Sequence, residues 1–207
     1  MDNVTVVRHP LAGHLLAGLR DERTEPERFR ALSHRLATVL VIEATRALAT
    51  AVQTVDTPLA PAPAHRIDRN VVAVPVLRAG LGLLEPVTQL LPDVQVGYVG
   101  LERDDETLQP TSYYLKVPPL ERSTVLLLDP MLATGGSASF ASRLLKDRGA
   151  RDLQLVCVVA APEGIARLAA DHPEVRVVTA AVDDRLDDSG FIVPGLGDFG
   201  DRLFGTP

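Results

Sequence analysis

The chain has 207 residues, of which 46% are hydrophobic and 23% charged, and its formal net charge is −6. This length and apolar content suffice for one substantial core, so we expect a single domain over 1–207. The acidic balance argues against a nucleic-acid partner, and no apolar run is long enough to cross a bilayer. The N-terminus lacks the apolar region of a signal peptide, and Cys157 is the only cysteine. A cytoplasmic protein with a buried, inert thiol is therefore expected.

The first predicted element is a helix that begins after Thr24. Thr24-x-x-Glu27 has the spacing of a capping box, and Pro26 suits the first helical turn. Apolar residues recur at helical spacing from Phe29 onwards, so this helix is expected to pack against the core. The Pro-rich stretch 58–63 that follows is typical of a surface loop.

Apolar runs typical of buried strands alternate with helical patterns through the rest of the chain. Strands are expected at 71–76, 94–99, 125–128, 153–160 and 175–182, and helices at 137–148 and 162–170. This alternation predicts an α/β fold whose central, largely parallel sheet is flanked by helices. The polar segment 103–119 is long for a connection and is interpreted as a lid.

Arg78 follows the first of these strands, within the sequence PVLRAGLG. An arginine at the end of a buried strand, beside glycines that expose the backbone, can bind a pyrophosphate through forked hydrogen bonds. A local ion pair with Glu85 is the structural alternative. The Gly80-x-Gly82 spacing also resembles a dinucleotide fingerprint, but Glu85 stands at the third glycine position. A Rossmann site is therefore not expected.

The sequence TVLLLDPMLATGGS, residues 124–137, carries the strongest signal for a ligand. Short side chains after the strand let backbone N–H groups surround an anion at the start of the next helix. Asp129 would repel a phosphate but can accept hydrogen bonds from sugar hydroxyls, so the predicted ligand is a sugar phosphate. Gly136 stands where a nucleoside triphosphatase loop places lysine, which disfavours that class. A tight turn without any ligand is the structural alternative.

The tail FIVPGLGDFGDR has three glycines and a proline among apolar residues, which predicts an irregular loop. A planar base can lie against such a backbone while N–H and C=O groups contact its edge. The structural alternative is a tail that docks by strand-like contacts.

Two other groups of polar residues are not expected to bind a ligand. The acidic run before the tail is interpreted as a solvated turn; it contains Asp183, Asp184, Asp187 and Asp188. The five histidines are interpreted as hydrogen-bonded within the protein or solvated.

Residues 124–137 resemble the ribose-phosphate binding motif of phosphoribosyltransferases, and Pro130 after the acid is similar to the uracil phosphoribosyltransferase family. The resemblance extends to PVLRAGLG, RDDETLQPTSYYLK, AAPEG and FIVPGLGDFGDRLFGT, and so spans essentially the whole chain. It implies a type I phosphoribosyltransferase-like fold with a C-terminal hood loop that binds the base. It also implies transfer of a phosphoribosyl group from phosphoribosyl pyrophosphate (PRPP) to uracil, which yields UMP and pyrophosphate in pyrimidine salvage.

The resemblance also assigns residues to the ligands. It implies three catalytic residues: Arg78, Arg103 and Asp129. PRPP contacts are implied for Arg78, Arg103, Asp129, Pro130, Met131, Leu132, Ala133, Thr134, Gly135, Gly136, Ser137 and Asp198. Uracil contacts are implied for Ile192, Gly197, Asp198 and Phe199. Thr107, Pro110 and Tyr113 match the family's lid. Phe199 departs from the family, where a small residue is usual, and Phe191 stands where tyrosine is common.

Mg²⁺ is the cofactor that the resemblance implies. Because Pro130 replaces a second acid, the ion is expected to be held by PRPP oxygens and water, and no protein metal ligand is assigned. A homo-oligomer is expected, and GTP is a candidate effector because it activates some relatives. Two alternatives stay open: a phosphoribosyltransferase-like regulator that binds RNA and senses UMP, and an enzyme of the same reaction that uses a purine base.

Overall fold

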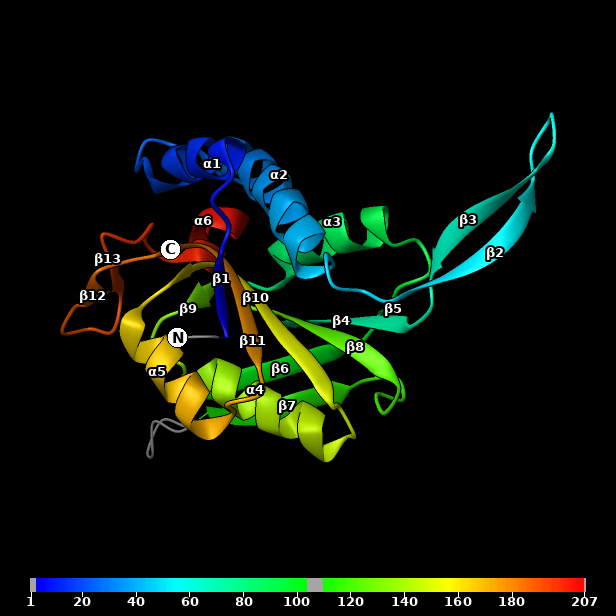
Figure 1. Cartoon of the computed structure of the whole chain (residues 1–207). Helices are drawn as coiled ribbons and strands as arrows, with labels where there is room; N and C mark the ends of the chain where they lie inside the picture. The colour runs from blue at the N-terminus through cyan, green and yellow to red at the C-terminus, as the bar shows by residue number, and fades with distance from the viewer. Residues whose placement is uncertain (1–2, 104–109, 207) are drawn as a thin grey trace.

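A largely parallel β-sheet forms the centre of the computed structural model, which describes residues 3–103 and 110–206 (Figure 1). Its main strands, in spatial order, are β1 (Val4–Val6), β11 (Arg176–Val182), β10 (Asp152–Ala160), β8 (Ser123–Leu128), β4 (Asn70–Leu77), β6 (Tyr98–Arg103) and β7 (Pro110–Lys116). The short strands β5 (Gln95–Val96) and β9 (Met131–Leu132) pair with β4 and β10. All these pairs are parallel except β6 with β7, which confirms the predicted sheet.

Helices cover both faces of the sheet (Figure 1). One face carries α1 (Pro10–Arg20), α2 (Pro26–Ala44), α3 (Leu81–Leu90) and α6 (Phe199–Phe204), and the other carries α4 (Gly136–Asp147) and α5 (Pro162–Asp171). Strand β8 serves both cores, because Leu126 and Leu128 pack on the α2 side while Val125 and Leu127 pack on the α4 side. This double burial explains its continuous apolar sequence.

The predicted capping box at Thr24 is wrong. Helix α2 begins at Pro26 with Glu25 as its N-cap, and no side chain caps it. The Thr24 hydroxyl instead donates to the Gly18 carbonyl at 2.7 Å, which ties the start of α2 to α1. A contact with a preceding helix competes with the local cap, and the local spacing does not reveal it.

The Pro-rich stretch 58–63 is not a simple loop but belongs to a β-hairpin. Strands β2 (Thr50–Asp56) and β3 (Pro61–Ile67) pair antiparallel, and the hairpin projects away from the sheet (Figure 1). Prolines are tolerated in β3 because a strand of an isolated hairpin has a free edge that needs no N–H donor. The sequence pattern of a loop and that of a proline-containing edge strand are therefore alike.

Two segments expected to be irregular contain regular structure. Residues 110–116 of the segment interpreted as a lid form strand β7, which pairs with β6 and extends the sheet, so this segment is not a long connection. Its role as a lid stays a prediction. Thr107 lies outside the described residues. The tail is only partly irregular, because β12 (Arg185–Leu186) pairs with β13 (Ile192–Val193) and α6 follows at Phe199. The irregular part is therefore the short segment 194–198 between β13 and α6.

Candidate active site

The carboxyl ends of β4 and β8 face the tail across a cavity of about 390 Å³. Ligands of parallel α/β sheets bind at this end of the strands. The lining combines residues from the β4–α3 turn, the segment after β8, the β12–β13 turn and the start of α6. These residues are Ala79, Asp129, Met131, Ala133, Ser189, Gly190, Phe191, Ile192, Gly197, Asp198, Phe199 and Gly200.

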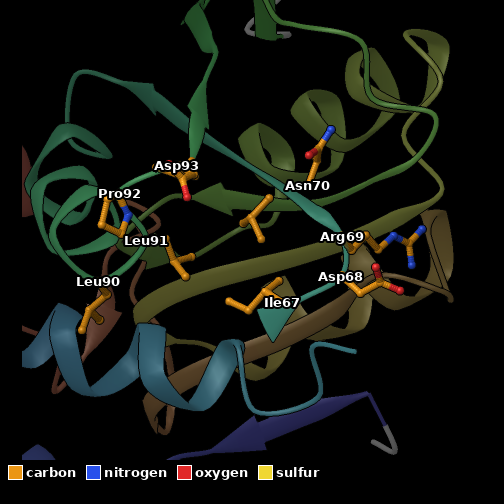
Figure 2. Close-up of a pocket in the computed structure, with 10 residues that line it drawn as sticks. Ile67, Asp68, Arg69, Asn70, Leu90, Leu91, Pro92 and Asp93 are labelled. Atoms are coloured by element: carbon orange, nitrogen blue, oxygen red, sulfur yellow. The ribbon is translucent and has the colours of Figure 1, made fainter. Parts of the chain in front are cut away.

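A second cavity, of about 400 Å³, lies at the opposite end of β4 between Ile67 and Val94 (Figure 2). Its one cationic side chain is already engaged: Arg69 lies 3.3 Å from the Asp152 carboxylate and donates to the Arg122 carbonyl at 3.3 Å. Because this cavity is at the amino ends of the strands, we assign the candidate site to the cavity that contains Asp129.

Asp129 lies half-buried, directly after β8. Its backbone N–H donates to the Val156 carbonyl at 3.2 Å, which fixes the carboxyl group relative to β10. Burial raises the pKa of the Asp129 carboxyl from 3.8 to about 6, although a hydrogen bond from the Met131 backbone opposes this rise. Hydroxyl donors from a ligand would favour the ionised form, so this acid is suited to accept hydrogen bonds from a sugar.

The turn from Ala133 to Ser137 leads from Ala133, which lines the cavity, to the N-terminus of α4. Helix α4 begins at Gly136, and its N-cap Gly135 has no side chain that could occupy the first N–H groups. The Thr134 hydroxyl lies 3.5 Å from the Gly136 nitrogen, at the limit of a hydrogen bond. The first amides of α4 therefore remain available to an anion, as the sequence pattern predicts.

Pro130 and Leu132 hold this turn against β10. The Pro130 carbonyl accepts from Val158 at 2.8 Å, and the Leu132 carbonyl accepts from Ala161 at 2.8 Å. The side chains of Pro130 and Leu132 are buried. These two predicted PRPP-binding positions thus have a clear structural role, and a ligand contact at either one stays a prediction.

Arg78 directly precedes Ala79, which lines the cavity. Its side chain is 64% exposed, and its guanidinium is 3.9 Å from the Asp201 carboxylate and 5.7 Å from the centre of the Phe204 ring. The alternative ion pair with Glu85 is not formed, since Glu85 lies 3.5 Å from His34. A weak, solvated contact leaves Arg78 able to bind a pyrophosphate.

Arg103 ends β6, but its side chain lies outside the described part of the molecule. Asp198 lines the cavity and caps α6, because its carboxylate accepts from the Asp201 N–H at 2.9 Å. Phe199 also borders the cavity, yet its ring is only 1% exposed and meets Phe29 edge-to-face at 5.2 Å between ring centres. The unusual Phe199 ring therefore fills the core beneath the site.

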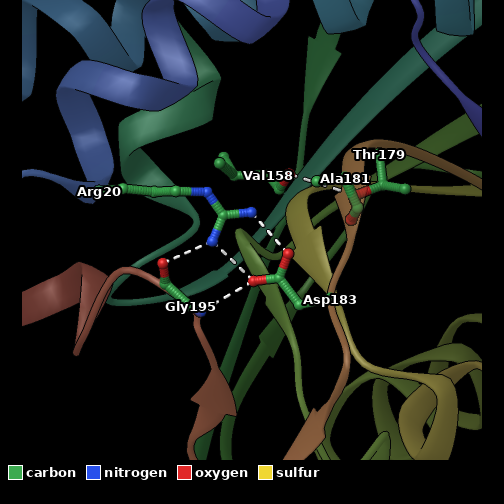
Figure 3. Close-up of polar contacts among 6 residues, drawn as sticks. All are labelled: Arg20, Val158, Thr179, Ala181, Asp183 and Gly195. Carbon is green, nitrogen blue, oxygen red and sulfur yellow. Dashed lines mark hydrogen bonds and ion pairs between the residues drawn. The ribbon is translucent and has the colours of Figure 1, made fainter.

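The interpretation of the acidic run as a solvated turn is wrong for Asp183, which is buried and paired with Arg20 (Figure 3). Asp187 has a local structural role, since its carboxylate accepts from the N–H groups of Ser189 at 2.9 Å and Phe191 at 2.8 Å. These bonds build the turn that brings Gly190 to the cavity. A run of four acids hides such roles because its composition resembles a surface turn.

The cavity also contains residues that sequence reasoning missed, namely Ala79, Ser189, Gly190 and Gly200. These residues are small and lie next to the predicted site residues, so they leave space in the cavity for a ligand. Ala79 could have been found as the neighbour of Arg78 in LRAGLG. Within the described residues, no three His, Cys, Asp or Glu side chains gather to hold a metal ion.

Cys157 lies in the centre of β10 and is fully buried. Burial raises the pKa of its thiol to about 12, so the group stays neutral. The prediction of a buried thiol is confirmed. No helix among the described residues is long and apolar enough to span a membrane.

Solved structures share this architecture. A purine phosphoribosyltransferase from Pyrococcus horikoshii aligns over 73% of this chain and 83% of its own with a TM-score of 0.51, at 15% identity. A protein of Aquifex aeolicus covers 97% of both chains with a TM-score of 0.92, at 37% identity. The fold, with its loop after β8 and its carboxylate beside it, defines the class of type I phosphoribosyltransferases.

Proteins related in sequence identify the family within this class. The family model for uracil phosphoribosyltransferase matches residues 6–206. Uracil phosphoribosyltransferase of Thermus thermophilus is 51% identical over 205 residues, which cover 98% of this chain and 99% of that protein. The protein of the same name from a Roseiflexus species is 50% identical over 207 residues and the whole of both chains. The chain belongs to the uracil phosphoribosyltransferase family.

Proposed function

We propose that this chain transfers the phosphoribosyl group of PRPP to uracil and releases UMP and pyrophosphate, as a salvage enzyme. The observation that carries the proposal is one cavity bordered by Asp129, by Ala133 at the start of the turn that leads into α4, and by the Gly197–Phe199 segment. Family membership supports uracil as the base, because the named relatives cover the whole chain.

The sugar phosphate would lie along the segment after β8. The first amides of α4 bind the 5′-phosphate, and the Asp129 carboxylate accepts hydrogen bonds from the ribose hydroxyls. Two fixed contacts orient the anomeric carbon toward the base, so positioning supplies part of the rate enhancement. PRPP-binding roles for Met131 and Ala133 are also proposed, and both residues line the cavity.

The rest of the rate enhancement would come from stabilising the charges that develop in the transition state. Cleavage at the anomeric carbon leaves positive charge on the ribose and negative charge on pyrophosphate. Arg78 and Arg103 are proposed to stabilise the departing pyrophosphate, and Asp198 to contact PRPP from the opposite side. Exclusion of water when PRPP and uracil fill the site would protect the ribosyl cation from hydrolysis, which would otherwise compete with transfer to uracil.

Uracil would lie against the tail segment. Its edge alternates C=O and N–H groups, which the backbone at Gly197 can match without a charged side chain. Ile192 supplies an apolar contact for the ring plane, and Asp198 and Phe199 contribute through the start of α6. The Phe199 ring packs in the core, so we assign its contact with the base to the backbone.

Mg²⁺ is proposed as the cofactor, and the available donors fit this ion. Asp129 and Asp198 are the carboxylates that line the cavity, too few for an octahedral cage. An ion with most ligands from pyrophosphate oxygens and water would suit them. When bound, Mg²⁺ neutralises negative charge on the leaving group, while Asp129 orients the ribose.

We also propose that the protein is a homo-oligomer in the cytoplasm, where a reducing environment suits its single thiol. The β2–β3 hairpin supports association. Both its strands are exposed, and an isolated hairpin is marginally stable in water. GTP is retained as a proposed effector on the family resemblance, and a titration of GTP into the uracil assay tests it.

One assay tests the function itself: product formation from PRPP with Mg²⁺ and uracil, cytosine, hypoxanthine or adenine in turn. We expect UMP from uracil and a kcat/KM about four decades lower for cytosine, whose edge reverses two donor and acceptor positions. Comparable use of cytosine would contradict the proposed backbone contacts. Preferential use of a purine, or RNA binding without any UMP formation, would overturn the assignment.

A further inference from the structure

We propose that the partly buried ion pair between Arg20 and Asp183 is a positioning device that fixes residues 194–198, the base-binding segment, and thereby sets the affinity for uracil. The inference rests on the proposed function, because it takes Gly197 and Asp198 as residues that contact the base. Neither Arg20 nor Asp183 lines the cavity. Both act on it through Gly195 (Figure 3).

The pair joins three separate parts of the chain. Arg20 is the last residue of α1, Asp183 follows β11, and Gly195 lies in the segment after β13. The Arg20 guanidinium donates to both Asp183 carboxylate oxygens, at 2.7 and 2.5 Å. The Asp183 side chain is only 5% exposed, so this bidentate contact is shielded from water.

Gly195 is bound on both sides of its backbone. Its N–H donates to the Asp183 carboxylate at 2.8 Å, and its carbonyl accepts from Arg20 at 2.7 Å. Its φ of +58° favours glycine, and an added Cβ would approach the Ile192 carbonyl oxygen to 2.1 Å. The conformation of the segment is therefore defined at this residue.

A second arginine extends the same arrangement. Arg202, in α6, donates to the Leu196 carbonyl at 2.7 Å and to the Asp21 carbonyl at 2.6 Å. The hydrogen bonds of Gly195 N–H, Gly195 C=O and Leu196 C=O thus all go to side chains. The segment that precedes Gly197 is held by two guanidinium groups anchored at the end of α1, and not by a β-ladder.

This arrangement predicts a selective kinetic effect. If the pair only stabilised the fold, weakening it would lower thermal stability without distinguishing the two substrates. If it positions the base-binding segment, the KM for uracil changes, while the turn from Ala133 to Ser137 (the phosphate turn), which β10 holds in place, keeps its geometry. The two interpretations therefore differ in the ratio of the two KM values.

The test compares Arg20→Lys with Arg46→Lys as a matched control. The single ammonium group that Arg20→Lys introduces cannot keep the two-pronged contact with Asp183 together with the Gly195 bond, whereas Arg46 forms an exposed pair with Glu43 at the far end of α2. We expect Arg20→Lys to raise the KM for uracil on the order of tenfold, with kcat little changed and a much smaller change in the KM for PRPP. Arg46→Lys should match the wild type in all three.

Hydrogen exchange gives a readout that needs no substrate. Peptides that cover 194–200 should exchange faster in Arg20→Lys than in the wild type, while peptides from α2 stay unchanged. Asp183→Asn should show the same pattern where it folds. Equal increases in both KM values, or a lower melting temperature with an unchanged KM for uracil, would overturn the inference. A wild-type enzyme that does not use uracil would instead contradict the proposed function, and the exchange result would still decide whether the pair fixes the segment.

Discussion

Arg78 is highly exposed and adjoins Ala79, which lines the cavity. We expect Arg78→Ala to lower turnover by roughly two to three decades, because the charge it would stabilise grows in the transition state. Steady-state rates at saturating PRPP check this. Arg46→Ala is the control, since Arg46 pairs with Glu43 on the surface. A turnover near that of the wild type would remove Arg78 from the mechanism.

Asp129 predicts a pH dependence. Its carboxyl pKa is raised to about 6, so the ionised form, which is proposed to accept hydrogen bonds from the ribose hydroxyls, is lost as the pH falls below that value. The KM for PRPP should rise by up to roughly tenfold per pH unit below pH 6. The KM for uracil should change far less. Asp129→Asn should show a high KM for PRPP that no longer varies with pH in this range.

The same group has the opposite effect on the stability of the ligand-free protein. Its native pKa exceeds the ordinary value of 3.8, so the folded state binds this proton more tightly than the unfolded state. The Asp129 contribution therefore stabilises the fold below about pH 4 and is lost as the pH rises through 6. Comparing the free energy of unfolding of the wild type and Asp129→Asn across this window measures it.

Phe199 affects stability more than chemistry. Its ring packs against Phe29 and closely approaches Gly82 in α3. Phe199→Ala should cost about 3–5 kcal/mol of unfolding free energy, because it leaves a cavity between α2, α3 and α6. Denaturant titration checks the value. Phe191→Ala is the matched control, since Phe191 is 48% exposed and should cost little.

The contact between α5 and the phosphate turn requires a glycine at position 164. A Cβ on Gly164 would lie 2.4 Å from the Ala133 carbonyl oxygen and 2.8 Å from that of Leu132. We expect Gly164→Ala to push α5 away from this turn and to raise the KM for PRPP about tenfold. Gly13→Ala in α1 is the control, because an added Cβ there meets nothing within 4 Å.

A KM for PRPP that is unchanged in Gly164→Ala would show that the turn does not depend on α5.

The AAPEG sequence contributes to the family resemblance without any obvious chemistry. The structure gives it a physical reason, since Glu163 also accepts from the Leu186 N–H at 3.1 Å and so joins α5 to β12.

The elements that the sequence predicted well are those whose signals are local. Buried strands appear as continuous apolar runs, and Asp129 follows one of them directly, so the position of the acid and of the α4 N-terminus could be inferred together. The pair of Arg20 and Asp183 could not, because the two residues are 163 positions apart and Asp183 lies in a run of acids. The direction of the Phe199 ring depends on α2, which lies far away in sequence.

The exposed β2–β3 hairpin is the surface through which we expect two copies of the protein to associate. Val52 and Ile67 lie on the same face of the hairpin, where Val52 is 65% exposed. If this face contacts a second copy, Val52→Asp should shift the protein toward a monomer. Light scattering coupled to size-exclusion chromatography measures the mass. Gln53→Asp, on the opposite face, is the control. A monomeric wild type at assay concentrations would contradict the proposal.

The connection between α1 and the tail has a consequence for how the protein is made. Arg20 and Gly195 are 175 residues apart, and Arg202 reaches back to Asp21 across 181 positions. A ribosome synthesises the chain from its N-terminus, so α1 emerges long before its partners exist. The phosphate turn can form on a growing chain, whereas the proposed base-binding segment is fixed only after Gly195 and Arg202 have been synthesised. A nascent chain stalled before Gly195 would therefore contain the phosphate turn but lack the base-binding segment.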